Sequence, residues 1–286
     1  MIISASRRCD LPAFGFESFL RSVAEGSVDL RNPFNAASIR RVSLAPNEVD
    51  CIVFWTRDPR PLLAGLDRLG ELRERCFVQV TVTGYPPSLE PGVAPTGAII
   101  EAVRILAARI GRERIAWRYD PVILAEGLDP AFHLSNFARL AEALAGSVAH
   151  IVLSLLDEYV ATRGRLGRAG YASPLFGSPR GEARAGDSRE SALPPQPWPE
   201  LLAGLAAITT SRGLETRACA EPFDLSPLGI AAEPCIDGPR LGKLFGFSPP
   251  EARDRGQRPA CRCASSVDIG EYGKCPAACV YCYARR

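Results

Sequence analysis

The chain has 286 residues, 47% of them hydrophobic, so it is long enough to bury a sizeable core. Its 34 basic and 32 acidic residues leave a net charge of +2, and this balance indicates neither a nucleic-acid nor an anionic-membrane partner. No apolar run reaches the roughly 18 residues that span a bilayer, and the first residues lack a basic leader before an apolar core. We therefore expect a cytoplasmic protein with no membrane partner.

Six short runs are rich in β-branched or aromatic residues and too apolar to face water on either side, which predicts buried strands. The stretch 27–44, after the first of them, can hold two additional short strands. Apolar residues at helical spacing separate most of the runs and predict amphipathic helices. The strands begin at Ile2, Cys51, Phe77, Arg114, His150 and Leu214, and the helical stripes lie within 16–23, 62–72, 99–110, 137–144 and 198–208.

Strands that alternate with helices pair in parallel, and right-handed crossovers then leave either a doubly wound sheet or a barrel. We favour a full or partial TIM-type (β/α) barrel, formed as a single α/β domain over 1–286. The segment 163–199 is dense in Gly, Pro, Ser and Arg and has no apolar period, which predicts a mobile insert. This insert is either a lid or, as its low-complexity composition favours, a solvated excursion without a catalytic role.

Polar side chains follow the predicted strands one after another. The carboxyl ends of parallel strands form the working surface of such folds, so these positions are the candidates for catalysis. An anionic ligand such as a carboxylate or a phosphate is favoured if the arginines at these positions converge on one mouth, because guanidinium binds both bidentately. These arginines are Arg7, Arg8, Arg57 and Arg118. For any single residue, an ordinary helix cap or salt bridge is the alternative. The candidate catalytic residues are Arg7, Arg8, Asp10, Arg118, Asp120 and Glu221.

Cysteines concentrate toward the end of the chain, where 261–286 forms a cysteine-rich tail. Ten cysteines in a reducing compartment indicate metal binding or reactivity before disulfides. Cys275, Cys279 and Cys282 have the spacing CxxxCxxC, which can bind three irons of a 4Fe-4S cluster and leave the fourth open. Zinc is the alternative, although structural zinc sites more often combine paired CxxC knuckles with four ligands. We therefore predict a C-terminal iron–sulfur cysteine loop.

Four more cysteines precede this loop and match the ligand count of a second iron–sulfur cluster or of tetrahedral zinc. Because they are widely spaced, whether they meet depends on the fold. If only one cysteine of the close CxC pair is a ligand, Cys261 is favoured. The candidate ligands of this second site are Cys219, Cys235, Cys261 and Cys263.

The tail resembles the radical SAM superfamily, in which a CxxxCxxC loop holds the cluster and S-adenosylmethionine chelates the fourth iron. Tyr281 is similar to the aromatic residue that lines the adenine in those enzymes, and Tyr283 completes a YCY string similar to the spore photoproduct lyase branch. The resemblance implies reductive cleavage of S-adenosylmethionine to a 5'-deoxyadenosyl radical. It also implies an electron donor as a partner.

Over nearly its whole length the sequence resembles family 1848 of the domains of unknown function, through strings such as ISASRRCDLPAF, WRYDP, QRPACRC and SVDIGEYGKCPAACVYCYA. In that family the cysteine triad stands at the C-terminus instead of after the first strand. The resemblance therefore implies a permuted arrangement, in which the final SVDIGEY run delivers the cluster loop to the barrel mouth. Ala278 stands where a glycine is expected, Arg57 where a lysine is usual, and no glycine-glycine-glutamate strand is evident.

Two functions remain open after this reading. The first is a radical-SAM-like enzyme that acts on an anionic substrate, either a small molecule or a macromolecule. The second is an iron–sulfur electron-transfer or binding protein that uses no S-adenosylmethionine. This second function includes association with nucleic acid. Such binding requires an extended basic groove with stacking aromatic residues, which the sequence does not demonstrate.

Overall fold

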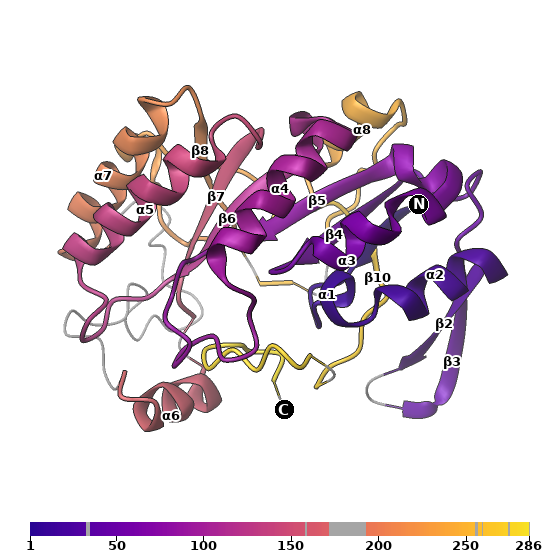
Figure 1. The fold of residues 1–286 in the computed structure, drawn as a ribbon, viewed down its shortest axis with the longest axis horizontal. Coiled ribbons are helices and arrows are strands. Elements are labelled where there is room, and N and C mark those ends of the chain that lie inside the picture. Colours follow the sequence, from indigo (N-terminus) through magenta and orange to yellow (C-terminus); the bar gives the residue numbers. More distant parts are fainter. Residues whose placement is uncertain are drawn as a thin grey trace.

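The computed structural model describes residues 1–32, 35–157, 159–171, 193–254, 257–258, 260–273 and 275–285. Eight strands form its main sheet: β1 (Ile2–Ala5), β4 (Cys51–Thr56), β5 (Cys76–Thr81), β6 (Ile115–Val122), β7 (His150–Leu155), β8 (Glu215–Ala218), β9 (Ala231–Ala232) and β10 (Val267–Asp268). Their order is β10-β1-β4-β5-β6-β7-β8-β9, and every neighbouring pair is parallel. Figure 1 shows the strands as one twisted layer.

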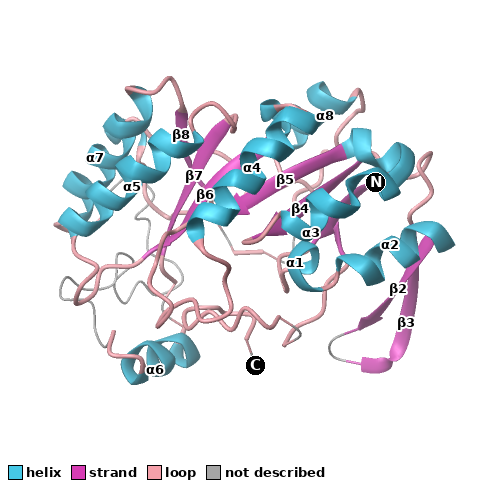
Figure 2. Ribbon diagram, in the orientation of Figure 1, coloured by secondary structure: helices cyan, strands magenta, loops and turns pink. Residues whose placement is uncertain are grey.

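The six predicted buried strands are confirmed as β1, β4, β5, β6, β7 and β8. The edge strands β9 and β10 are missed because two residues carry no readable apolar pattern. The two additional strands expected within 27–44 are β2 (Ser27–Asn32) and β3 (Asn35–Ser43), which pair antiparallel in a sheet of their own. Figure 2 shows this hairpin standing apart from the main sheet, next to the first helices.

The helices confirm the predicted stripes and add three that the periodicity did not indicate, α1, α6 and α8. The α-helices are α1 (Leu11–Phe14), α2 (Phe16–Glu25), α3 (Arg60–Gly65), α4 (Thr96–Ile110), α5 (Pro130–Leu144), α6 (Val160–Arg168), α7 (Trp198–Thr210) and α8 (Gly238–Phe245), and the 3-10 helices are η1 (Leu66–Arg75), η2 (Arg112–Arg114) and η3 (Ser226–Leu228).

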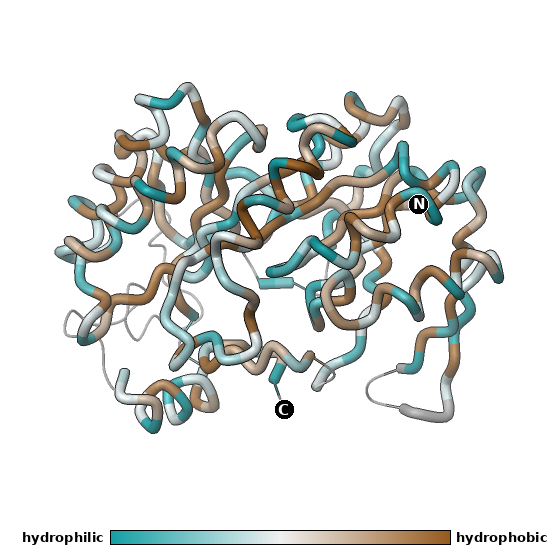
Figure 3. The backbone as a smooth tube through the Cα atoms, in the orientation of Figure 1, coloured by the Kyte–Doolittle hydropathy of each residue, from teal (hydrophilic) through white to brown (hydrophobic). Residues whose placement is uncertain are grey.

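The two faces of the sheet bury different residues, because successive side chains of a strand point to opposite sides. On the outer face, Ile52 and Trp117 belong to one large core together with apolar residues of α2, α3, α4, α5 and α7. On the inner face, Val53 and Val152 pack with Leu241 of α8 and with buried cysteines. Figure 3 shows hydrophobic residues concentrated along the strands and polar ones on the outer turns.

From β1 to β9 the strand order advances in one direction across the sheet. This α/β arrangement is compatible with a partial TIM-like barrel and with a Rossmann-like sheet. Among the described residues, β9 and β10 are edges that pair with one neighbour each, so the sheet is open. The closed barrel that the sequence analysis allowed is not formed, because its last two strands are short and lie at opposite edges.

The connection from β9 to β10 crosses the inner face, because these strands lie at opposite edges of the sheet. We call residues 233–266 the crossing segment; it includes α8. The chain then continues from β10 into the tail, drawn in yellow in Figure 1, which runs past the ends of the strands toward α6.

The predicted insert at 163–199 is described only at its two ends. Residues 163–168 belong to α6, and α7 begins at Trp198. The stretch 172–192 lies outside the described residues. No helix in the described part of the chain is long and apolar enough to cross a membrane.

His133 is a buried histidine that makes stability depend on pH. Its ring nitrogens pair with the Tyr119 hydroxyl and the Ile123 carbonyl, both at 2.8 Å. Burial lowers the pKa of His133 from 6.5 to about 4, so below pH 6.5 the unfolded chain takes up the proton first. Stability is therefore lost as the pH falls from 6.5 toward 4. Between pH 7 and pH 5 this histidine is expected to remove about 2 kcal/mol from the free energy of unfolding.

Urea unfolding of the wild type and of His133→Phe at both pH values measures this effect. The variant should lack the increment due to His133, whatever its stability at pH 7. His150, whose pKa burial lowers to about 3, contributes to both proteins and so does not affect the comparison. Equal losses in the two proteins would contradict the assignment.

Candidate functional site

Three cysteines that follow β10 lie together at the carboxyl ends of the strands, and we call Cys275, Cys279 and Cys282 the tail triad. Cys279 is buried and the other two are half-buried. Each thiol lies within electrostatic range of the other two. Burial raises the pKa of Cys279 to about 11, and the backbone N–H of Asp10 donates to the sulfur of Cys275. The tail therefore meets the loop after β1 through Cys275.

Neighbouring elements hold the loop of the tail triad on two sides. The N–H of Val280 donates to the Leu89 carbonyl at 2.9 Å, and the N–H of Gly92 donates to the Ala277 carbonyl at 3.0 Å. A Cβ on Gly92 would lie 2.6 Å from a carbonyl oxygen of the tail, so only glycine permits this close approach. From α6, the guanidinium of Arg165 donates to the Val280 carbonyl at 2.9 Å.

A buried carboxylate, that of Glu90, ties the tail to the strand ends. Its Oε1 accepts from the Arg57 guanidinium and the Thr83 hydroxyl, each at 2.6 Å, and from the hydroxyl of Tyr281. The guanidinium of Arg57 lies over the Tyr281 ring, 5.3 Å from its centroid. Burial by itself lowers the pKa of Arg57. The Glu90 carboxylate and other nearby groups together raise it by more than this, so the net shift of the pKa is upward. Arg57 is a fixed positive charge beside the tail triad.

Four buried cysteines from distant parts of the sequence meet on the inner face of the sheet. We call Cys219, Cys235, Cys261 and Cys263 the four-cysteine group; their side chains are 2–9% exposed. The thiols of Cys219 and Cys263 each interact with the other three by hydrogen bonding. Hydrogen bonding from the neighbouring thiols lowers the pKa of Cys263 and raises that of Cys219. The structure thus brings together all four residues that the sequence proposed as a second ligand set.

Arg118 connects the four-cysteine group to the sheet. Its guanidinium donates to the sulfur of Cys235 at 2.7 Å and to the carboxylate of Asp120. It also lies over the Trp55 ring at 5.1 Å, and the Gln79 amide donates to the Cys235 carbonyl at 2.6 Å. Burial lowers the pKa of Arg118, while the neighbouring Cys235 and Asp120 raise it more.

Polar contacts run without a break from the four-cysteine group to the tail triad. Besides its ion pair with Glu90, the guanidinium of Arg57 donates to the Asp120 carbonyl at 3.2 Å. Two of the candidate arginines, Arg57 and Arg118, therefore belong to one series of polar contacts. In order, the series joins Cys235, Arg118, Asp120, Arg57, Glu90 and Tyr281.

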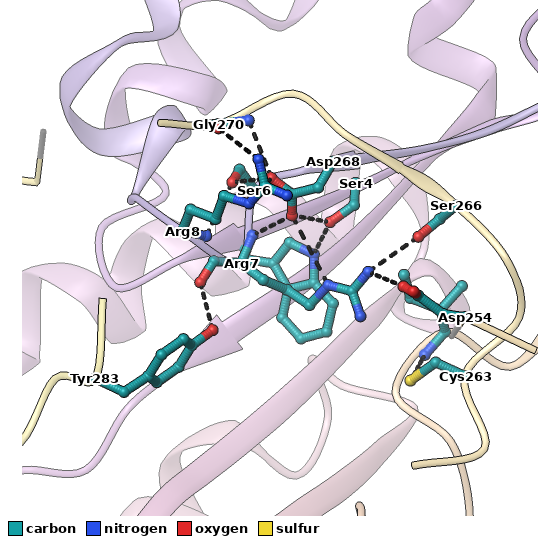
Figure 4. Close-up of polar contacts among 12 residues, drawn as sticks. Ser4, Ser6, Arg7, Arg8, Asp254, Cys263, Ser266, Asp268, Gly270 and Tyr283 are labelled. Carbon is teal, nitrogen blue, oxygen red and sulfur yellow. Dashed lines mark hydrogen bonds and ion pairs between the residues drawn. The ribbon is translucent and has the colours of Figure 1, made fainter. Parts of the chain in front are cut away.

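Arg7 and Arg8 lie beside Asp268 of β10 (Figure 4). The guanidinium of Arg7 also lies 6.0 Å from the centroid of the Trp55 ring, which Arg118 contacts as well. Arg7 also pairs with Asp254 of the crossing segment at 2.6 Å, and its carbonyl accepts from the Tyr283 hydroxyl at 2.8 Å. The guanidinium of Arg8 lies 3.8 Å from Asp268 and 5.1 Å from the Tyr272 ring centroid. Asp268 itself accepts four hydrogen bonds: from Ser4 Oγ (2.9 Å), Ser6 Oγ (2.6 Å), Arg7 N (2.9 Å) and Gly270 N (3.0 Å).

Asp10 has the structural role that the sequence analysis kept as its alternative. Its carboxylate caps α1 by accepting from the N–H of Ala13 at 3.0 Å, and it accepts from the N–H of Arg57 at 2.7 Å. Burial raises the pKa of Asp10 to about 6. The side chain therefore joins the loops after β1 and β4.

Glu221 lies at the carboxyl end of β8 and lines a cavity of about 410 Å³. Its carboxylate accepts from the Ser154 hydroxyl at 3.2 Å and from the N–H of Leu155 at 3.0 Å. The residues on either side of two cysteines also line the cavity. They are Ala218 and Ala220, which flank Cys219, and Ala260 and Arg262, which flank Cys261. Chain neighbours of the four-cysteine group therefore line the cavity, whereas the four cysteines themselves do not.

Neither cysteine group already has the coordination geometry of a metal site. Among the described residues, no set of three or more His, Cys, Asp or Glu side chains is arranged to hold an ion as it stands. All ten cysteines are free of disulfides. The ligand predictions therefore remain predictions, although the structure gathers each predicted set.

A family model described as "Domain of unknown function (DUF1848)" matches residues 2–284. The chain belongs to the DUF1848 family. No curated protein and no solved structure matches it. The DUF1848 match extends over both cysteine groups and over every strand of the main sheet.

Three acidic residues of this DUF1848 chain were missed by the sequence analysis: Glu90, Asp254 and Asp268. Asp268 lies within the string SVDIGEY, which leads into the tail triad, so its place in the sequence was a usable signal. Glu90 and Asp254 lie in loops without any recognisable motif. Their partners, Arg57 and Arg7, are far away in the chain, and only the folded sheet brings them together.

Proposed function

We propose that this DUF1848 chain is an iron–sulfur enzyme similar to radical SAM enzymes, with a 4Fe-4S cluster bound by the tail triad. The observation that carries the proposal is the position of the triad at the carboxyl edge of a parallel sheet. Working sites of parallel α/β folds lie at this edge. The loops after β1, β4 and β5 all contact the tail there, through Asp10, Arg57 and Glu90.

The donor set fits such a cluster. Three thiols within electrostatic range of one another match three irons and leave the fourth for another ligand. Arg57 lies close enough to Cys279 to lower its thiol pKa against the effect of burial, so its charge favours a thiolate. Ala278, directly before Cys279, has a φ of 52°. Left-handed backbone is strained in a non-glycine residue, and such strain collects at functional sites.

When bound, the cluster supplies one electron for reductive cleavage of S-adenosylmethionine. The residues of the chain position the loop and shield it from water. Glu90 and Arg57 orient Tyr281, while Tyr85, Leu89 and Ile123 bury the loop on its protein side. An electron donor is the partner that this function requires.

We propose an anionic substrate, bound at the strand ends. Arg7 and Arg118 are held in ion pairs with carboxylates that are at most partly exposed, so we assign them, with Asp10 and Asp120, to positioning the loops. Arg8 is 30% exposed and 3.8 Å from Asp268, which makes it the predicted arginine best placed to reach a ligand. Glu221 lines the cavity of about 410 Å³ and is the candidate to contact substrate there.

For the fold we propose a partial TIM-type barrel in a cytoplasmic protein. The support is the one-way strand order together with α2, α3, α4, α5 and α7 on the same face. The inner face packs against the short helix α8, whereas a Rossmann-like sheet carries its crossover helices on both faces. The ten free cysteines are the support for a reducing compartment.

One observation favours the alternative, an iron–sulfur electron-transfer or binding protein, with or without a nucleic-acid partner. Tyr281, expected to line an adenine, is already engaged by Glu90 through its hydroxyl and by Arg57 through its ring. A ring held in this way positions the loop. It contributes to nucleotide binding only with the edge that remains free.

Anaerobic reconstitution tests the proposal. About four irons per chain should be bound by the tail triad, and the electron paramagnetic resonance signal of the reduced protein should change when S-adenosylmethionine is added. A variant with Cys275, Cys279 and Cys282 all replaced by alanine should lose this iron and all 5'-deoxyadenosine formation. A signal that ignores S-adenosylmethionine would support the electron-transfer alternative, and a colourless protein with only zinc at the triad would refute both.

Cys76→Ala is the matched control, because Cys76 is a buried thiol of β5 outside both cysteine groups. It should keep the iron. Gly92→Ala provides a second variant, since its Cβ displaces the tail without removing a ligand, and it should lower iron occupancy. Gly97→Ala, whose Cβ meets nothing within 4 Å, should leave occupancy unchanged.

A further inference from the structure

The four-cysteine group lies in one buried cluster on the inner face, where its thiols interact with one another. Cys219 and Cys263 each interact with the other three thiols, and Cys261 and Cys263 come from one CxC string. On a cube, each cysteine sulfur binds a different iron, so the whole iron–sulfide core separates the four sulfurs. Thiols that interact directly with one another suit one shared ion better than a cube.

A single ion fits this packing. A zinc ion with four thiolates at about 2.3 Å in a tetrahedron holds their sulfurs about 3.8 Å apart, close to van der Waals contact. An entering ion replaces the thiol protons, which are released to solvent, and small shifts of the sulfurs complete the tetrahedron. The group is not arranged for an ion as it stands, so this adjustment is part of the inference.

The surroundings supply what a negatively charged tetrathiolate centre needs. Arg118 donates to the Cys235 sulfur at 2.7 Å, and the N–H of Ile236 donates to the Cys263 sulfur at 3.4 Å. Hydrogen bonds of this kind orient ligands and offset their charge. A second guanidinium, that of Arg7, lies within electrostatic range of Cys263.

We propose that Cys219, Cys235, Cys261 and Cys263 bind one zinc ion in a closed structural site. This proposal does not depend on the tail triad or on the proposed enzyme function. The ion joins β8 to three points of the crossing segment and so fixes the course of that segment over the inner face. The cavity of about 410 Å³ is lined by chain neighbours of Cys219 and Cys261, and we expect the ion to enter from this side.

Backbone strain marks the same place. Among the described residues only Ala220 and Ala278 are non-glycine residues with positive φ, and each adjoins a cysteine, one from each group. Ala220 has a φ of 59° and follows Cys219 directly. Strain that persists beside a ligand is typical of a functional site.

Metal analysis of the alanine variant of the tail triad tests the zinc site separately from the iron site. Purified without air, this variant should retain about one zinc per chain and no iron. Refolded with Co²⁺ in place of zinc, it should develop the intense thiolate-to-cobalt absorption of a tetrahedral tetrathiolate centre. Cys219→Ala in the same background should lose both the zinc and the cobalt absorption.

Cys51→Ala is the matched control, because Cys51 is a buried thiol in the same inner-face core and outside the four-cysteine group. It should keep the zinc, so a loss confined to Cys219→Ala is not a general effect of truncating a buried cysteine. Iron with sulfide in the triad variant would overturn the single-ion site in favour of a second cluster. A folded triad variant with neither zinc nor a cobalt signal would overturn the site altogether. Failure of the iron experiment leaves the zinc result unaffected.

Discussion

Replacing Glu90 with glutamine is expected to lower the free energy of unfolding by about 3 to 5 kcal/mol, the range seen when one partner of a buried ion pair is removed. Glu90 is only 6% exposed, and its Oε1 accepts from Arg57, Thr83 and Tyr281. Glutamine keeps the size of the side chain but removes the charge. The guanidinium of Arg57 then stays buried without its carboxylate partner. Urea unfolding at neutral pH measures the loss.

The double variant Glu90→Gln with Arg57→Met separates the ion pair from general packing. It should be less destabilised than the sum of the two single variants, because no charge is then left buried alone. Glu17→Gln, which disturbs the exposed pair with Arg68, should change little. Iron occupancy of the tail triad should fall in Glu90→Gln, since Tyr281 loses its anchor. A Glu90→Gln protein as stable as Glu17→Gln would rule out this role for Glu90.

Replacing Asp268 with asparagine is expected to be the second large effect, about 3 kcal/mol of unfolding free energy. Both carboxylate oxygens accept two hydrogen bonds each, and the backbone donors Arg7 N and Gly270 N are among them. In asparagine an NH2 group takes the place of one of the two carboxylate oxygens. This group faces the donors that the oxygen accepted from, so at least one buried donor loses its acceptor. Arg7 keeps Asp254, which limits the loss.

Because β10 has only two residues, Asp268 supplies much of what holds it to β1. The tail begins directly afterwards, so Asp268→Asn should lower the iron content as well as the midpoint of urea unfolding. Asp29→Asn is the matched control, since Asp29 forms a bidentate pair with Arg41 on the exposed hairpin. A drop in stability of the same size in both variants would contradict the assignment.

Both cysteine groups depend on the same late part of the chain. The crossing segment carries three cysteines of the four-cysteine group to the end of β8, and β10 then turns the chain toward the tail triad. The chain of contacts from Cys235 to Tyr281 connects the two groups through Arg118 and Glu90. The two groups therefore share one framework of polar contacts, although each set of cysteines is tested separately.

Much of the fold was predictable because its signals are local. Short β-branched runs such as CIVFW predict the buried strands. Apolar residues at helical spacing, such as Ile99, Val103 and Leu106, predict the helices. α6 was missed because its apolar face is short and lies within a stretch rich in Gly and Arg. The two-residue strands β9 and β10 carry no pattern at all.

The candidate site was predictable only where its members are neighbours in the chain. CxxxCxxC can be recognised because its three cysteines lie within eight residues, so the spacing itself indicates which side chains can meet. Arg7 and Arg118 lie against the same Trp55 ring, and Arg57 donates to the carbonyl of Asp120, the partner of Arg118. What the spacing of residues could not indicate is the separate carboxylate of each arginine, in Asp254, Glu90 and Asp120. Ion pairs between distant loops leave no trace in the spacing of residues.

The sequence by itself determined the buried strands, most of the helices and the tail triad, since each is encoded by contiguous residues whose period or spacing has physical meaning. Only the tertiary structure decided that the sheet is open and that Cys219 meets Cys235, Cys261 and Cys263. The reason is the crossing segment. Its path over the inner face depends on which strands occupy the edges of the sheet, and that is settled by contacts between residues far apart in the chain.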